Sequence, residues 1–355
     1  MATSRDDDAH QSREESGEAR GARKPTSPTS IHRAGWLTVF KRALREFGKD
    51  EATDVAASLT YYAVLALFPA LLAIVSVLSL IGQDEQVVGG LMELFRSVAP
   101  EETVRTLEDP LMELADAPGA GLTFVVGLVG AIWSASGYVR SFSRGMNRIY
   151  GVQEGRTFLK LQPAVLLITV FAIVVLTAMA LILVVSGPIA TAVGSLIGLG
   201  EPALIAWNIA KWPVLVILAA GIIAVLYYFA PNVRQPRFRW VSVGAVVALL
   251  VWALTTAGFF FYAANFSNYS ATYGSLGGII IFLLWLYLSN MALLYGAEVD
   301  SELERVRELQ AGIKAEYAVQ LPLRDTTKID KNVDAEASAV LEARSLRLSN
   351  GKDNG

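Results

Sequence analysis

The sequence predicts an all-α, polytopic integral membrane protein with six transmembrane helices. Hydrophobic residues make up 53% of the 355 residues and charged residues only 18%, whereas soluble domains carry about 25% charged residues. A helix needs about 20 apolar residues to cross a bilayer, and each of the five longest charge-free stretches exceeds that length. These stretches are 55–83, 117–139, 161–200, 212–233 and 240–297. The last is long enough for two helices, which brings the expected total to six.

The polar N-terminal region precedes the first membrane helix. Residues 1–34 contain almost no large apolar residues, so we expect a disordered cytoplasmic tail. Residues 35–54 place Trp36, Phe40 and Phe47 at helical spacing opposite a basic side. This pattern predicts an amphipathic helix on the cytoplasmic face of the membrane. The alternative is a solvated helix packed on the protein.

The membrane domain is expected to occupy residues 55–299. Its six helices are predicted at about 55–82, 119–142, 161–186, 205–230, 238–263 and 276–297. Gly187 and Pro188 end the third helix. The first connector, 83–118, is acidic and is predicted to form amphipathic helices outside the membrane. Residues 300–355 are charged and are expected to form a largely disordered cytoplasmic tail, whose first part, SELERVRELQ, has a helical pattern.

The basic residues predict how the helices are oriented. With the N-terminus inside, the inner segments of the membrane domain and its N-terminal flank hold twelve Lys and Arg residues and the outer segments three. Because positive charge accumulates on the cytoplasmic side, we expect a multi-pass protein of the bacterial plasma membrane with both termini in the cytoplasm. No signal-peptide pattern occurs in residues 1–30, so the first membrane helix is expected to direct insertion.

Composition excludes several kinds of chemistry. The chain has no cysteine, which excludes thiol nucleophiles and cysteine-ligated metals. Its only histidines, His10 and His32, lie in the N-terminal tail. The net charge of −3 argues against a nucleic-acid partner. We therefore expect no enzyme activity and no cofactor or metal.

The inner end of the second membrane helix carries the first candidate site. Arg140, Arg144 and Arg148 are spaced by four residues and share one helix face. Guanidinium groups suit phosphate recognition, so this arginine column, with Asn147 and Tyr150, is a candidate site for an anionic lipid headgroup. The alternative is that the column is only a topology signal.

The turn between the fifth and sixth helices is the second candidate. It is polar but uncharged, and such a turn near the membrane must satisfy its own backbone groups. We interpret it as a hinge or gate; the alternative is an ordinary helix turn within an aromatic belt. The candidate residues are Asn265, Tyr269, Tyr273, Gly274 and Ser275.

The first membrane helix offers a third candidate. Ser58, Thr60, Tyr61 and Tyr62 place four hydroxyl groups near its start, and Pro69 is expected to kink it. These residues are candidates for lining a cavity; the alternative is that the hydroxyl groups only link helices.

A carboxylate at the end of the sixth helix is the fourth candidate. Glu298 could pair with the arginine column or take part in proton coupling, or it could simply meet water at the interface. No Asp or Glu occurs in the middle of any predicted membrane helix, which makes a buried carboxylate relay a weaker hypothesis.

Four stretches together resemble the YihY/BrkB family of bacterial inner-membrane proteins. They are AASLTYY at 56–62 with Phe68 and Pro69; WSASG at 133–137 with Asn147 and Tyr150; 262–278, ending in YGSLGG; and LWLYLS at 284–289 with Gly296 to Glu298. The resemblance covers about 36–305. It implies a link to virulence or serum resistance, and for some members transport of anionic lipids. An older label, ribonuclease BN, implies a nuclease. We interpret that label as incorrect for this chain, because a metal-dependent nuclease needs clustered His, Asp or Glu ligands.

Two functional hypotheses follow from the residues and the resemblance. The first is a transporter or flippase-type protein that handles an anionic amphipathic substrate such as a lipid. The second is a non-transporting envelope scaffold associated with virulence. Expected partners are membrane lipids, including anionic ones, and either a second copy of the chain or an envelope protein.

Overall fold

The computed structural model describes residues 33–81, 120–184, 200–235, 242–265 and 276–349. Within these ranges the protein is helical, and the one β feature is an isolated bridge between Val233 and Leu323. The helices are α2 (Arg33–Lys49), α3 (Ala52–Ile81), α6 (Ala120–Ile149), α7 (Phe158–Val184), α9 (Glu201–Phe229), α10 (Val243–Asn265), α12 (Leu276–Gln310) and α13 (Thr327–Leu348).

The predicted membrane helices all correspond to helices of the structure. Four of them, α7, α9, α10 and α12, are long and apolar enough to cross a membrane. The other two, α3 and α6, are each 30 residues long. Length and composition in the described residues thus support four of the six predicted spans.

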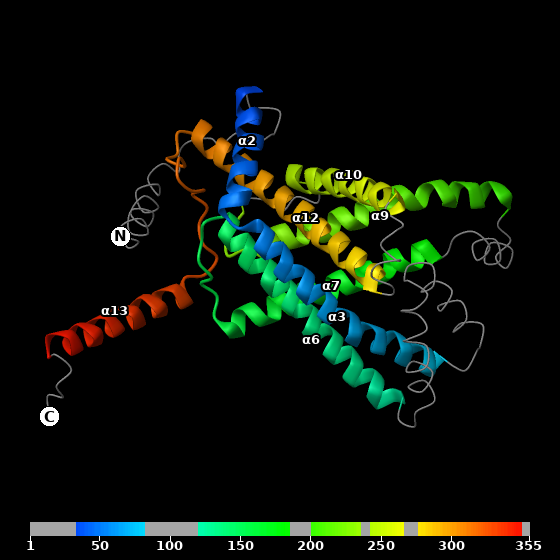
Figure 1. Ribbon diagram of the computed structural model, residues 1–355, viewed down its shortest axis with the longest axis horizontal. Coiled ribbons are helices and arrows are strands. Elements are labelled where there is room, and N and C mark those ends of the chain that lie inside the picture. Colours follow the sequence, from blue (N-terminus) through cyan, green and yellow to red (C-terminus); the bar gives the residue numbers. More distant parts are fainter. Residues whose placement is uncertain (1–32, 82–119, 185–199, 236–241, 266–275, 350–355) are drawn as a thin grey trace.

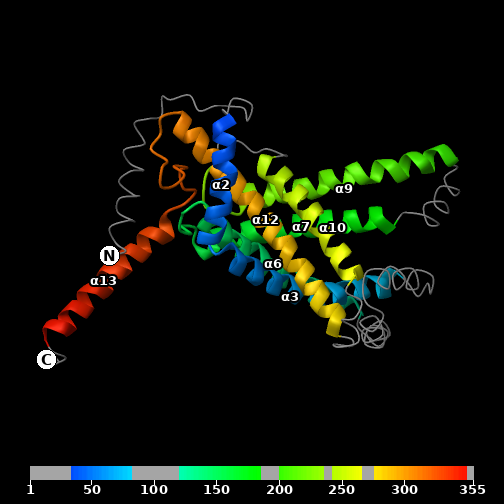
Figure 2. The same cartoon turned by 45° about the horizontal axis from the view of Figure 1, so that its top comes forward.

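The helices pack mainly in pairs that are close in the chain. α3 runs along α6, α10 runs along α12, and α7 contacts α9, as both views show (Figures 1 and 2). The buried core joins all six long helices and is richest toward the end at which α2 lies. Many of the side chains exposed on the long helices are large and apolar, as expected of a surface in contact with lipid.

Two glycines allow α10 and α12 to come close together. A Cβ atom built on Gly244 would lie 2.2 Å from the backbone oxygen of Gly296, and one on Gly296 would lie 2.4 Å from that of Gly244. Only glycine fits at such a crossing. The backbone N–H of Gly244 also donates to Asp300 Oδ1 at 2.7 Å, which ties the start of α10 to α12.

The predicted amphipathic helix is present as α2 and crosses α12 (Figure 2). Val39 and Ala43 are buried against Val299 and Leu303 of α12, while Leu44 on another side is exposed. α2 thus packs on the protein through one face and leaves an apolar side chain on another.

Within residues 300–349, the described part of the charged C-terminal region, the structure contains two helical segments. α12 continues to Gln310, and α13 extends away from the bundle (Figure 1). Between them, Val319 and Leu321 are buried in the core. Hydropathy did not indicate the position of Val319 and Leu321, because their burial depends on contacts with the bundle rather than on local composition.

Several predicted regions lie outside the described residues. They are the N-terminal tail as far as residue 32, the whole of the acidic connector, and the hinge residues Tyr269, Tyr273, Gly274 and Ser275. Asn265 is the last residue of α10.

Candidate functional site

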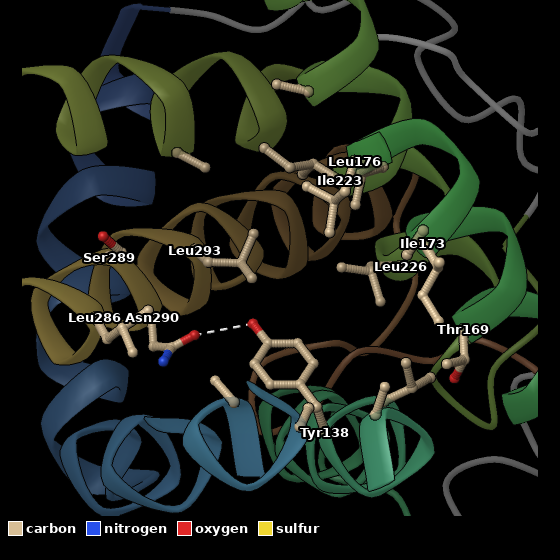
Figure 3. Close-up of a pocket in the computed structure, with 18 of the residues that line it drawn as sticks. Tyr138, Thr169, Ile173, Leu176, Ile223, Leu226, Leu286, Ser289, Asn290 and Leu293 are labelled. Carbon is tan, nitrogen blue, oxygen red and sulfur yellow. Dashed lines mark hydrogen bonds between the residues drawn. The ribbon is translucent and has the colours of Figure 1, made fainter. Parts of the chain in front are cut away.

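A cavity of about 500 Å³ lies in the middle of the bundle. Every one of the six long helices contributes to its wall, and nearly all the lining side chains are apolar (Figure 3). The wall includes Ala63 and Ala66 of α3, Ala135 and Tyr138 of α6, Thr169, Ile173 and Leu176 of α7, Ala219, Ile223 and Leu226 of α9, Ala248 and Trp252 of α10, and Leu286, Ser289, Asn290 and Leu293 of α12. A chamber with this lining suits hydrocarbon rather than a charged solute.

One side of the cavity carries a short chain of neutral hydrogen bonds. The Tyr138 hydroxyl donates to Asn290 Oδ1 at 2.9 Å, and Asn290 Nδ2 donates to Thr60 Oγ1 at 3.1 Å. Thr60 in turn donates to the backbone oxygen of Ala56 at 2.8 Å. Figure 3 shows the Tyr138 ring reaching from α6 toward Asn290 across the cavity edge. These bonds link α3, α6 and α12 without introducing a charge.

The three arginines of the column have different environments. Arg148 is held by Glu51, whose Oε2 accepts at 2.8 Å from Arg148 Nη1. Arg140 Nη2 donates to Gln162 Oε1 of α7 at 2.6 Å. Arg144 is exposed. The column therefore does not act as one uniform basic face: Arg148 is in an ion pair, whereas Arg140 pairs with a neutral amide.

Asn147 and Tyr150, predicted to accompany the column, are both buried. Tyr150 accepts a hydrogen bond from Gln235 Nε2 at 3.2 Å. Asn147 Nδ2 donates to Glu154 Oε2 at 3.0 Å, and its Oδ1 accepts from the backbone N–H of Asn232 at 2.7 Å. These contacts point into the protein, so in the structure both side chains contact neighbouring loops.

The arginine that makes the most hydrogen bonds among the described residues was not a candidate predicted from the sequence. Arg156, in the loop between α6 and α7, donates from Nε and Nη2 to the two carboxylate oxygens of Glu154, each at 2.7 Å. Its Nη2 also donates to the Ala230 oxygen at 2.7 Å and to Ser143 Oγ at 3.0 Å. The only local signal was the Glu154–Arg156 spacing, which does not reveal the contacts with α6 and α9.

Asn232 joins this arrangement to the C-terminal segment. It is fully buried, and its Nδ2 donates to the Asp325 backbone oxygen at 2.9 Å and to that of Gln153 at 3.1 Å. Asp325 also donates its backbone N–H to Asn232 Oδ1 at 3.2 Å. We call Asn147, Glu154, Arg156, Asn232 and Asp325 the polar latch, because it fastens two loops and the C-terminal segment together.

The charges of the polar latch are stabilised in their ionised forms. Burial opposes ionisation of Glu154, but its hydrogen bonds with Arg156 outweigh that effect and hold its pKa below the ordinary value. Hydrogen bonds from Lys160 and Thr327 hold the pKa of Asp325 well below its usual range. The latch is therefore a set of satisfied ion pairs and hydrogen bonds at neutral pH.

The hydroxyl groups at the start of α3 mostly connect helices. Ser58 shares a hydrogen bond of 2.9 Å with Ser141 of α6, and Thr60 belongs to the chain described above. Tyr61 is exposed, and Tyr62 lies against Gly137. Neither tyrosine is among the residues that line the cavity, to which α3 contributes alanines instead. The side chain of Pro69 lies outside the described residues.

Glu298 is buried rather than placed at a water interface, with 1% of its surface exposed. Its Oε1 has no hydrogen-bond partner in the part of the chain that the structure describes. The predicted pairing with the arginine column is absent there, because Arg148 pairs with Glu51 and Arg140 with Gln162. The described residues also contain no cluster of three His, Cys, Asp or Glu side chains suited to a metal ion.

Comparison with known proteins places the chain in a family. The profile of the family described as virulence factor BrkB matches residues 43–319. Over 274 residues the chain is 30% identical to the ribonuclease-like protein YfkH of Bacillus subtilis (strain 168), covering 77% of this chain and 98% of that protein. No solved structure matches.

Two further relatives are named as membrane proteins. The UPF0761 membrane protein NTHI0384 of Haemophilus influenzae (strain 86-028NP) is 26% identical over 269 residues, covering 74% of this chain and 94% of that protein. The UPF0761 membrane protein PBPRA3489 of Photobacterium profundum is 27% identical over 290 residues, covering 78% of this chain and 82% of that protein. The family description names no enzyme, although one relative carries a ribonuclease-like name. This chain, with its bundle of long apolar helices, belongs to the BrkB family of membrane proteins.

Proposed function

We propose that this protein handles an anionic amphipathic lipid, as a transporter or flippase-type protein of the bacterial plasma membrane. The observation that carries the proposal is the apolar cavity of about 500 Å³ between the six long helices. An acyl chain is the common membrane component that such a chamber accommodates. The neutral hydrogen-bonding chain in its wall keeps three helices together without excluding hydrocarbon.

The cavity also supports a bundle of six spans. α3 and α6 supply Ala63, Ala66, Ala135 and Tyr138 to the same wall as the four strongly apolar helices. If that wall lies at the depth of the acyl chains, α3 and α6 cross the membrane with the others. Their more polar ends do not contradict this, since they extend beyond the cavity toward α2.

Both ends of the membrane domain lie on one side. Arg42 of α2 donates to Glu302 of α12 at 3.0 Å, so the helix that precedes the membrane domain and the end of its last helix meet at the same end of the bundle. That end carries the arginine column and the polar latch, and its basic residues favour the cytoplasm. This arrangement supports an even number of spans with both flanking segments inside.

Photolabelling tests whether acyl chains enter the cavity. The protein would be reconstituted with phosphatidylglycerol carrying a diazirine in its acyl chain, irradiated and mapped by peptide mass spectrometry. We expect labels on cavity-lining residues such as Ile173 and Ile223. Ala219→Phe, which fills part of the cavity, should reduce those labels at least threefold, because the ring occupies the space of the chain.

A matched control uses the same substitution on the same helix. Ala210 of α9 is exposed on the outside of the bundle, so Ala210→Phe should leave cavity labelling unchanged. Labels confined to outward-facing residues in the wild-type protein would contradict the proposal. Labels in the cavity without movement of fluorescent lipid across proteoliposomes would remove the transport part and favour a non-transporting envelope role.

A further inference from the structure

Arg140 and Gln162 form a polar pair with unused donors. Arg140 Nη2 donates to Gln162 Oε1 at 2.6 Å, which fixes the amide so that its Nε2 faces elsewhere. That Nε2 and the Nε of Arg140 are both buried, and neither has a hydrogen-bond partner in the part of the chain that the structure describes. Gln162 as a whole is 8% exposed. Two buried N–H donors without acceptors are costly, which is unusual for a pair that already shares one good bond.

The unused donors belong to a centre of net positive charge. Three nearby cations have carboxylate partners: Arg156 pairs with Glu154, Lys160 with Asp325, and Arg148 with Glu51. Arg144, one helical turn from Arg140, is exposed. Arg140 has no such ion pair among the described residues. A neutral amide accepts one hydrogen bond but does not balance this charge, and an anion would supply both the missing charge and the missing acceptors.

The pair lies close to the cavity along two helices. Val139, the neighbour of Arg140, lines the cavity wall, and so does Thr169, seven residues after Gln162 on α7. At about 1.5 Å rise per residue, seven residues of helix span about 10 Å. A group bound at the pair would thus lie about two helical turns from the apolar chamber, on the side of the arginine column.

We propose that Arg140 and Gln162 form the binding site for the phosphate group of an anionic lipid, with its acyl chain in the cavity. This inference rests on the proposed function and names the headgroup chemistry of the same site. Phosphate suits the site because one phosphorus centre presents several acceptor oxygens, which accept from Arg140 Nε and Gln162 Nε2 together. Arg148, held by Glu51, takes no part in the site.

The test compares two lipids that differ only in the phosphate. Binding of phosphatidic acid and of diacylglycerol with the same acyl chains would be measured by native mass spectrometry of the full chain from mild detergent. We expect the wild-type protein to bind phosphatidic acid at least about tenfold more tightly, because charge-assisted hydrogen bonds form only with the phosphate.

Gln162→Glu is the most informative variant, because it is nearly isosteric. The new carboxylate pairs with Arg140 and repels an anion, so the protein should fold while the preference for phosphatidic acid falls below about threefold. Binding of diacylglycerol should not change. Arg148→Met removes a charge of the same column outside the site and should keep the full preference. A preference that persists in Gln162→Glu would overturn the proposed site.

Competition with inorganic phosphate distinguishes a lipid headgroup from a free phosphate ion as the ligand. If phosphate alone competes with phosphatidic acid for the wild-type protein, but does not bind Gln162→Glu, the shared phosphate chemistry is supported. Phosphate binding without any preference between the two lipids overturns the lipid headgroup and leaves a soluble anion as the ligand. If neither lipid binds, the proposed function fails, while the phosphate arm still tests Arg140 and Gln162 independently.

Discussion

Two arginines, Arg140 on α6 and Arg156 in the loop that follows it, have contrasting environments. Arg156 is buried in the polar latch and donates to Glu154, Ser143 and backbone oxygens at the end of α9. Arg140 reaches α7 and donates only to Gln162, leaving a buried Nε without a partner among the described residues. Both are basic residues at the same end of the bundle, yet only one is satisfied by the protein itself.

The difference indicates two distinct roles. A buried charge with a carboxylate partner and complete hydrogen bonding holds elements together, and removing one member leaves the other uncompensated. A partly buried charge whose buried donors have no acceptor does not stabilise the fold, because unmade hydrogen bonds are costly, and a bound anion would supply the acceptors. On this basis the polar latch is structural, and the pair formed by Arg140 and Gln162 is the candidate for binding.

The largest expected effect is the loss of the latch arginine. Arg156→Ala removes the cation that pairs with the Glu154 carboxylate, which should lower the free energy of unfolding by about 3–5 kcal/mol. Thermal unfolding in detergent micelles, followed by size-exclusion chromatography, measures the change. The control is Arg148→Ala, whose exposed ion pair with Glu51 should contribute about 1 kcal/mol or less. Equal losses of stability in the two variants would contradict the proposed difference between the polar latch and an exposed ion pair.

A smaller loss of stability is expected when the pH is lowered. Because the pKa of Glu154 is lower in the folded protein than its ordinary value of 4.5, its contribution to stability is complete above that value. The contribution is lost as the pH falls through the lower folded pKa. The midpoint temperature of the wild-type protein should therefore drop by a few degrees more between pH 5 and pH 3.5 than that of Glu154→Gln. Parallel pH profiles of the two proteins would argue against a charged latch.

The smallest change in stability is expected for Arg140 and Gln162, whose buried donors have no partner among the described residues. The double variant Arg140→Met with Gln162→Leu removes both partners and replaces them with apolar groups of similar length. Its free energy of unfolding should change by about 1 kcal/mol or less, and an increase is equally consistent, because two unsatisfied donors disappear. The same thermal assay without added lipid measures it. A loss as large as that of Arg156→Ala would assign the pair to the fold rather than to binding.

Periodicity and charge predicted the helices well but the sites only in part. Each predicted membrane helix corresponds to a helix of the structure, and four of them are long and apolar enough to cross a membrane. α6 and α12 extend beyond their apolar stretches to Ile149 and Gln310. The arginine column was recognisable because its spacing repeats along one helix. The sequence did not show that Arg148 forms an ion pair whereas Arg140 pairs with a neutral amide. Their partners, Glu51 and Gln162, come from other parts of the chain.

The sequence by itself determined that this chain is helical and rich in membrane-length apolar segments, since those properties depend on local composition and spacing. Only the tertiary structure revealed the cavity, the polar latch and the ordered segment around Leu321. Each of these depends on contacts between residues far apart in the chain, such as Asn232 with Asp325 and Tyr138 with Asn290. Burial and hydrogen bonding depend on those tertiary contacts. The contacts therefore decide which of several similar polar side chains stabilises the fold and which keeps donors without partners.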